Sequence, residues 1–174
     1  DNNFIDTEPF KGLFTQGMVC HETYKDENNN WLSPEELITE DNKNFYLKKD
    51  PHKKVRVGPS ESMSKSKKNT IDPEMIIKNF GADAVRLFIL SDSPPEKDVQ
   101  WSERGMESSY KFLQKLWSLH NKILSKKSDK DKKNDEMEIF TNQIIQKITN
   151  NLENFHYNVI IANLHEIYRF YRSE

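Results

Sequence analysis

The segment Ser62–Phe88 has the sequence SMSKSKKNTIDPEMIIKNFGADAVRLF. The predicted secondary structure changes within this segment. Its first eight residues, Ser62–Asn69, alternate small hydroxyl side chains with lysines and predict a loop. A helix is expected immediately afterwards, because Asp72 is a good N-cap residue, Pro73 suits the first helical position and Gly81 suits the C-terminal end. We therefore predict mixed strands and short helices before this segment and helices alone after it.

Short strands are expected before the loop. Pro9 favours a helical turn over Glu8–Leu13, and Met18–Tyr24 with Trp31-Leu32 predict a hairpin. Phe45–Leu47 and Val55–Val57 predict two further strands. This part is α/β in character, but it is too small to be a complete parallel α/β domain.

Long amphipathic helices are expected after the loop. The pair Pro94-Pro95 ends a second helix that follows Gly81, and Ser102 caps a third, long helix. Apolar residues recur with a 3.6-residue period in that helix and in two more, at about 135–154 and 156–172. Such helices form a bundle or most of one, so the predicted fold is mainly α with a small α/β part.

Composition narrows the class of protein. The chain has 174 residues, of which 34% are hydrophobic and 31% charged, and its net charge of −2 gives no global attraction to nucleic acid. Positive charge is instead local, at Lys53–Lys68 and at Lys122–Lys133, the latter within a predicted exposed loop. A single cysteine excludes an internal disulfide framework and predicts a reducing, cytoplasmic location.

Two features of the whole chain bear on membrane association and on the length of the protein. No apolar run reaches membrane-spanning length and no leader precedes the first strand, so we expect no membrane association. Residue 1 is Asp rather than Met, and the chain stops at Glu174 inside an expected helix. We therefore expect it to be part of a longer protein.

The loop has the chemistry of a phosphate-binding segment. Six of the seven charged side chains from Lys53 to Lys68 are cationic, and only Glu61 opposes them. Hydroxyl donors, backbone N–H groups and mobile ammonium groups together suit a polyphosphate. The alternative is a solvated lysine-rich loop without a ligand.

The sequence around the loop resembles a known family. Met63–Ser66 resembles the KMSKS signature of class I aminoacyl-tRNA synthetases, and the continuation through Asp72-Pro73 and Phe80–Arg86 is also similar. Thr15–Val19 and Leu90–Trp101 resemble the leucyl-tRNA synthetase family in particular. The resemblance extends over nearly the whole chain.

The resemblance implies an organisation and an activity. Residues 1–70 would be the remnant of a Rossmann-like class I catalytic domain, 71–105 a helical stem-contact or connecting segment, and 106–174 an incomplete helical anticodon-binding bundle that docks tRNA. The family activates leucine with ATP and transfers it to tRNA(Leu), and a monomer is expected.

The resemblance also implies site residues. Lys65 would be the catalytic residue that contacts the ATP phosphates as negative charge develops on them. Met63, Ser64 and Ser66 would complete the ATP-binding loop, with Met63 near the adenosine. Mg²⁺ would arrive with ATP, since no metal ligands are evident in this sequence.

The sequence departs from the family pattern at Ser62, where the first lysine of the motif would stand. This departure removes one cation, for which Lys67 or Lys68 would compensate. Loops of this kind open and close, and Gly58-Pro59 suits a hinge in front of the loop.

A second family motif, HIGH, is absent from the sequence. We therefore predict that these 174 residues alone do not activate leucine. Two alternatives remain at this point: a stand-alone helical RNA-binding or interaction module that retains the loop, and part of a sibling class I synthetase for isoleucine, valine or methionine.

Several other residues favour structural roles. Cys20-His21 has no second ligand pair with metal spacing, so a core thiol beside a strand histidine is expected. Asp83 and Arg86 are three residues apart on a helix and predict a surface ion pair. Trp101 and Trp117 are expected to anchor the core.

Overall fold

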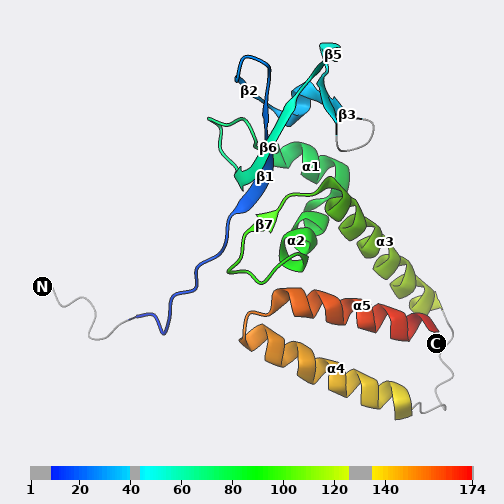
Figure 1. Cartoon of the computed structure of the whole chain (residues 1–174). Helices are drawn as coiled ribbons and strands as arrows, with labels where there is room; N and C mark the ends of the chain where they lie inside the picture. Colours follow the sequence, from blue (N-terminus) through cyan, green and yellow to red (C-terminus); the bar gives the residue numbers. More distant parts are fainter. Residues whose placement is uncertain (1–8, 40–43, 126–134, 174) are drawn as a thin grey trace, which may run out of the picture.

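The computed structural model describes residues 9–39, 44–125 and 135–173 (Figure 1). Its first sheet is built around strand β1, Val19–Lys25. β1 runs antiparallel to β2 (Trp31–Leu32) and β6 (Arg56–Ser62) and parallel to β7 (Val99–Gln100). β6 comes before the loop and β7 comes after the two helices that follow the loop. Both strands pair with β1, so the sheet holds the two ends of this segment together.

A second, three-stranded sheet packs beside β1. It consists of β3 (Leu37–Thr39), β4 (Phe45–Leu47) and β5 (Asp50–Lys54), all antiparallel, and a 3-10 turn at Pro34–Glu36 leads into it. Its apolar side meets the first sheet in a small core of Tyr24, Leu32 and Val55. The predicted hairpin and the predicted strand at residues 45–47 are confirmed, whereas β3 and β5 were not predicted.

The strand before the loop differs from its prediction. β6 extends through Gly58 and Pro59 to Ser62, and Gly58 lies opposite Thr23 in the β1–β6 ladder. A Cβ atom on Gly58 would lie 2.5 Å from Thr23 Oγ1, and the same hydroxyl donates a hydrogen bond to the Pro59 carbonyl at 3.1 Å. The Gly58-Pro59 hinge stays a prediction; in this structure Gly58 pairs with Thr23, and Pro59 lies at the irregularity of the ladder with its carbonyl bound by the Thr23 hydroxyl.

Two short helices follow the loop as predicted. The Asp72 carboxylate caps α1 (Pro73–Phe80) by accepting a hydrogen bond from Glu74 N–H at 2.9 Å. Gly81 ends α1 with φ of +81°, a conformation that favours glycine. On α2 (Ala82–Ser91), Arg86 donates to Asp83 at 2.9 Å with both side chains exposed, as expected for a surface ion pair.

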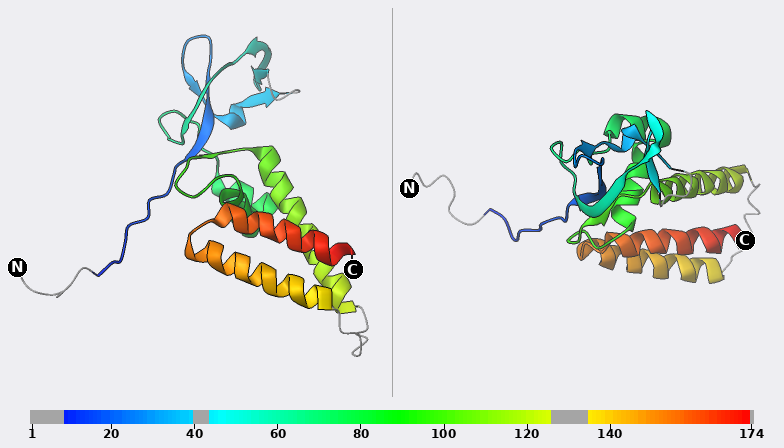
Figure 2. Two further views of the ribbon diagram at one scale, coloured as in Figure 1. Left: turned by 60° about the horizontal axis from the view of Figure 1, so that its bottom comes forward. Right: turned by 45° about the horizontal axis from the view of Figure 1, so that its top comes forward.

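The three long helices are also present. They are α3 (Glu103–Ser125), α4 (Asp135–Glu153) and α5 (Tyr157–Ser173). Figure 2 shows α4 and α5 as an antiparallel hairpin, with α5 lying between α4 and the rest of the molecule. A shared core of Leu87, Phe112 and Ile161 joins α2, α3 and α5, so α2 is packed with the long helices.

The two tryptophans have different environments. Trp101 packs edge-on against Phe88, with ring centroids 5.4 Å apart, beside the fully buried Ala84 and Met106. Trp117 is 69% exposed on α3. The prediction of a core role is confirmed for Trp101 and wrong for Trp117.

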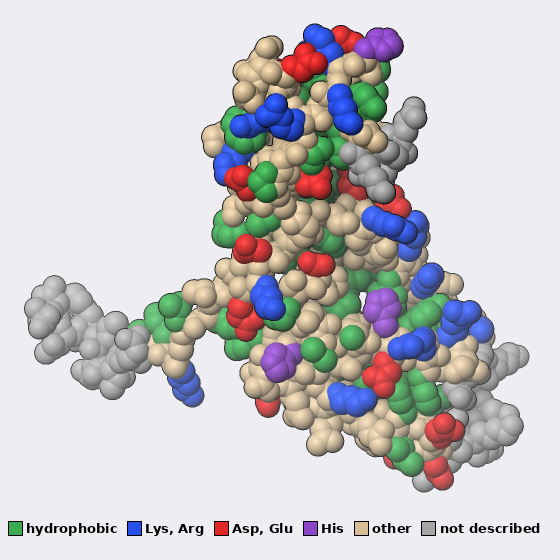
Figure 3. Space-filling model, in the orientation of Figure 1, with side chains coloured by type: hydrophobic (Ala, Val, Ile, Leu, Met, Phe, Trp, Pro, Cys, Tyr) green, Lys and Arg blue, Asp and Glu red, His purple; other side chains and the backbone are tan. Residues whose placement is uncertain are grey.

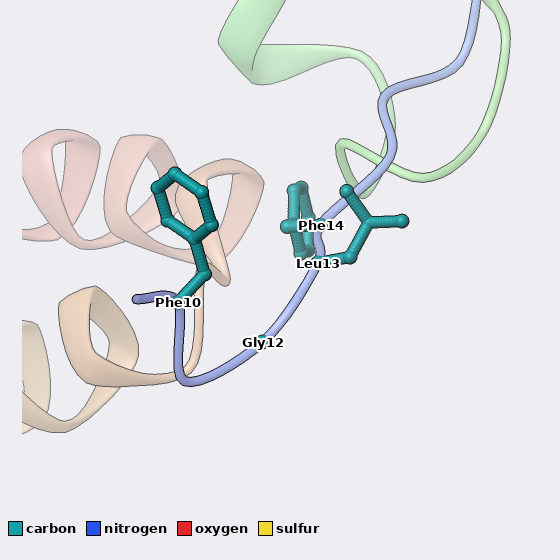
Figure 4. A pocket seen from close by; sticks show the side chains of 4 residues that line it. All are labelled: Phe10, Gly12, Leu13 and Phe14. Atoms are coloured by element: carbon teal, nitrogen blue, oxygen red, sulfur yellow. The ribbon is translucent and has the colours of Figure 1, made fainter. Parts of the chain in front are cut away.

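An extended arm precedes β1. Phe10, Leu13 and Phe14 line a shallow pocket of about 470 Å³ along it, near the α4–α5 turn (Figure 4). The Phe14 ring stacks on Phe155 in that turn, with centroids 4.8 Å apart, and Gly17 N–H donates to Pro95 O at 2.9 Å. The described part of the predicted Glu8–Leu13 turn, residues 9–13, is not helical.

Two further expectations concern the loop between α3 and α4 and the membrane. Most of the predicted loop between α3 and α4, residues 126–134, lies outside them. Within them, no helix combines the length and apolar character needed to cross a membrane.

Candidate functional site

The lysine-rich loop connects the end of β6 to α1 and projects beside the first sheet (Figure 1). β6 ends at Ser62, and Met63 N–H still donates to the Val19 carbonyl of β1 at 3.1 Å. Lys65–Lys68 then form a turn. The five residues proposed for the motif, Ser62–Ser66, thus begin on the sheet and end in the exposed turn.

Asn69 holds the loop to the sheet. Its side chain is completely buried, and its amide NH₂ donates to the carbonyls of His21 at 3.2 Å and Glu61 at 3.1 Å. Its Oδ1 accepts a hydrogen bond from Ser64 N–H at 2.8 Å. Asn69 therefore ties the two ends of the loop to each other and to β1.

The role of Asn69 was missed in the sequence. The available signal was chemical, because an asparagine side chain both donates and accepts hydrogen bonds and so can close a loop.

Serine hydroxyls shape the turn itself. Ser64 Oγ accepts a hydrogen bond from Lys67 N–H at 3.3 Å and lies 3.2 Å from Ser66 Oγ. Lys68 N–H donates to Lys65 O at 3.3 Å, and Lys68 has a left-handed φ of +54°. The turn thus places the side chain of Lys65 and the hydroxyl of Ser66 in solvent.

The three lysines of the turn have different surroundings. Lys67 forms an ion pair with Glu61 of β6. Lys68 lies near Glu36. Hydrogen bonds from Ser33 are the main cause that lowers the pKa of Glu36, and the charge of Lys68 makes a smaller contribution in the same direction. Lys65 is exposed and has no ion-pair partner among the described residues, so it is the cation most available to an anionic ligand.

Cys20 and His21 lie in β1, next to the loop. The Cys20 thiol is buried, 4.0 Å from Ser62 Oγ, which confirms the predicted core position. Burial lowers the pKa of His21, and this effect exceeds the opposite influence of Glu22 and Glu103. In the described ranges no three His, Cys, Asp or Glu side chains are grouped closely enough to hold a metal ion.

The arrangement offers anion recognition rather than a complete catalytic centre. Lys65 supplies an exposed charge, and the hydroxyls of Ser64 and Ser66 supply hydrogen-bonding groups. Met63 is half-buried at the start of the loop and is the apolar residue of the motif. These are the groups that a phosphate chain lying over the turn would meet.

Comparisons with known proteins place the chain in a family. Residues 49–102 match the family model of class I tRNA synthetases (I, L, M and V). A leucine–tRNA ligase from Rickettsia canadensis is 47% identical over 175 residues, which cover 100% of this chain and 21% of that protein. One from Rickettsia bellii is 47% identical over 167 residues, with 96% and 20% covered.

A solved structure is also similar. It is the ternary complex of Agrobacterium radiobacter K84 agnB2 LeuRS with tRNA and LeuAMS, with a TM-score of 0.54 and 27% sequence identity. The similarity covers 63% of this chain and 15% of the solved chain.

The family model spans β5, β6, the loop and both short helices, so the fold and the loop define a class I aminoacyl-tRNA synthetase. Within this class, the relatives that match from end to end are leucine–tRNA ligases. The chain therefore belongs to the leucyl-tRNA synthetase family. It spans about a fifth of the length of the curated relatives it matches.

Proposed function

We propose that the chain is the part of a leucine–tRNA ligase that closes over ATP and docks tRNA(Leu). The complete ligase would join leucine to ATP as leucyl-adenylate and then transfer leucine to the tRNA. The observation that carries this proposal is the turn at Lys65–Lys68, which exposes Lys65 within a chain 47% identical to such ligases.

The proposed chemistry depends on charge. The leucine carboxylate attacks the α-phosphorus of ATP and pyrophosphate leaves, so negative charge grows on the phosphate oxygens. A lysine placed over these oxygens stabilises the transition state more than the ground state. In this proposal Lys65 has that role, Met63, Ser64 and Ser66 complete the ATP contact, and Mg²⁺ enters bound to ATP.

The parts of the fold receive proposed roles as well. Residues 1–70 form the C-terminal part of a Rossmann-like catalytic domain, residues 71–105 connect it, and residues 106–174 belong to the anticodon-binding bundle. The protein is proposed to act as a cytoplasmic monomer. The alternatives of a stand-alone RNA-binding module or a sibling synthetase are not favoured, because the relatives that match the entire chain are named for leucine.

A chimera tests the proposal. This chain would replace the matching segment of the Rickettsia canadensis ligase, and leucine-dependent ATP–pyrophosphate exchange would be measured. We expect the chimera to be active and Lys65→Ala to lower kcat roughly 100-fold. Lys54→Ala, which removes an exposed cation from β5, is the matched control and should change kcat little.

An equal loss of exchange activity in the Lys65 and Lys54 variants of the chimera would reject the role of Lys65, and an inactive chimera would reject the ligase role of the chain. Leucine-dependent exchange by the 174-residue chain alone would reject the separate prediction that this chain is inactive without the rest of the ligase.

A further inference from the structure

Asn69 is completely buried although it lies at the end of an exposed loop. Its exposed fraction is 0%, whereas both of its neighbours in sequence, Lys68 and Thr70, are exposed. Where the loop projects beside the first sheet, Figure 3 shows Lys and Arg side chains at the molecular surface. The loop therefore presents lysines to solvent and turns one uncharged side chain inward.

This inward side chain is bound to the residue that directly precedes Lys65. Asn69 Oδ1 accepts a hydrogen bond from Ser64 N–H at 2.8 Å, and a rigid, planar peptide group joins Ser64 to Lys65. The Asn69 amide NH₂ donates to the carbonyls of His21 on β1 and Glu61 on β6, at 3.2 and 3.1 Å. One side chain thus holds the backbone from which Lys65 extends against two strands of the sheet.

The other attachments of the loop restrain Lys65 less. Met63 N–H donates to a carbonyl of β1 at 3.1 Å, but this contact lies before the turn begins. The ion pair of Lys67 with Glu61 leaves 37% and 34% of the two side chains exposed, and pairs of this kind hold their partners only weakly in water. The hydrogen bonds inside the turn do not reach the sheet.

We propose that Asn69 is a positioning residue for Lys65 and acts on adenylate formation through that lysine. The inference rests on the proposed function, in which Lys65 lies over the phosphates of ATP. A lysine side chain is long and flexible, so the place its ammonium group can occupy depends on where its backbone is held. Because a displacement of about 1 Å at a reacting site can lower the rate roughly 100-fold, loss of Asn69 should lower kcat.

A purely structural role for Asn69 predicts a different result. Loss of folded protein, or a general disturbance of the site, would lower activity by the same factor whether or not Lys65 is present. A positioning role predicts that the two losses are not additive, because misplacing Lys65 has no further effect once its ammonium group is removed. A double-variant cycle therefore separates the two roles.

Leucine-dependent ATP–pyrophosphate exchange by the chimera measures this cycle. Asn69→Ala should lower kcat by about 10- to 100-fold and change the KM for leucine by less than about twofold. In the Lys65→Ala chimera the same substitution should lower kcat by less than about threefold more. Asn79→Ala, at an exposed position of α1, is the matched control and should leave kcat within about twofold in both backgrounds.

A second variant covers the case in which Asn69→Ala does not fold. Asn69→Asp keeps the size of the side chain and its acceptor for Ser64 N–H, but an ionised carboxylate cannot donate to the two strand carbonyls. The same cycle with Lys65→Ala applies to this variant, and the same lack of additivity is expected. Circular dichroism would show which variants are folded.

NMR relaxation of the 174-residue chain tests the position of the loop without any activity. Asn69→Ala should lower the order parameter of the Lys65 amide from about 0.85 to below about 0.6, because the loop is no longer held against the sheet. The amide of Val57, in β6, should keep its order parameter in the same variant. Asn79→Ala should change neither value.

Three results would overturn the inference. They are equal factors of loss in the two backgrounds, an unchanged kcat in a folded Asn69→Ala chimera, and an unchanged order parameter at Lys65. An inactive chimera would reject the ligase role of the chain, and relaxation would still decide whether Asn69 holds Lys65 in place. An active chimera with equal losses would reject the positioning role and retain the ligase role.

Discussion

Lys67 and Glu61 form an ion pair that spans the loop from its turn to the last part of β6. The pair engages one of the two lysines expected to compensate for the serine at position 62. The number of lysines in the sequence therefore overstates the positive charge available to a ligand. Because Lys67 is paired, Lys65 is the exposed cation nearest the middle of the motif.

The ion pair gives a first prediction. In the active chimera, Lys67→Ala should reduce kcat for ATP–pyrophosphate exchange much less than Lys65→Ala, because Glu61 already neutralises the Lys67 charge. Glu61→Gln should release Lys67 and lower the KM for ATP. A larger loss for Lys67→Ala than for Lys65→Ala would reverse the assignment.

Asn69 gives a second prediction. Asn69→Ala removes three hydrogen bonds and leaves the His21 and Glu61 carbonyls without this donor, so the free energy of unfolding should fall by about 2–4 kcal/mol. Asn69→Asp should also destabilise, since a carboxylate cannot donate to the two carbonyls and would bury a charge. Urea denaturation measures both, with the exposed Asn79→Ala on α1 as control. Equal stability of the Asn69 and Asn79 variants would contradict the anchoring role.

The close approach of β6 to β1 gives a third prediction. Gly58→Ala should lower the free energy of unfolding by about 1–3 kcal/mol, because the new methyl group would overlap Thr23 Oγ1. Thr23→Ala removes that oxygen, so the double variant should lose less than the sum of the two single losses. Gly12→Ala, which has open space around its Cβ position, is the control. Strict additivity at positions 58 and 23 would exclude the clash.

His21 gives a fourth prediction, on pH. Its pKa is lowered in the folded chain from 6.5, chiefly by burial, so the unfolded state binds more protons between the two values. Folding stability contributed by the neutral ring is complete above about pH 6.5 and is lost as the pH falls towards the folded-state pKa.

Urea denaturation at pH 7.5, 6.5 and 5.5 would show the effect. His21→Gln should reduce the loss of stability on acidification, whereas His52→Gln, on the exposed strand β5, should retain the wild-type profile. Identical profiles for the two variants would mean that His21 does not contribute.

The helices were predictable because their signals are local. Asp72, Pro73 and Gly81 cap α1 where the sequence suggested, and the 3.6-residue period located the three long helices. The period of the apolar residues does not show which part of a helix's apolar face is covered by another helix in the folded chain. That is why Trp117, which lies on α3 with the correct spacing, is exposed, while Trp101 is packed on Phe88.

The strands were harder to predict because they depend on partners distant in sequence. β5 is polar and mostly exposed, so only its pairing with β4 makes it a strand. Gly58 and Pro59 are poor strand residues by propensity, yet the bulge at Glu22/Thr23 and the hydrogen bond from Thr23 accommodate them. The motif Ser62–Ser66 was visible in the sequence, but its anchor at Asn69 required the folded sheet.

The stacking of Phe14 on Phe155 connects the arm that precedes β1 to the turn of the α4–α5 hairpin. The same strand carries the His21 carbonyl from which Asn69 holds the loop. The hairpin therefore contacts the rest of the chain in two places, at Phe14 of the arm and at the core that α5 shares with α2 and α3. Phe14→Ala removes the ring contact at the arm and leaves the core contact of α5 in place, so the two attachments of the hairpin can be separated by one substitution.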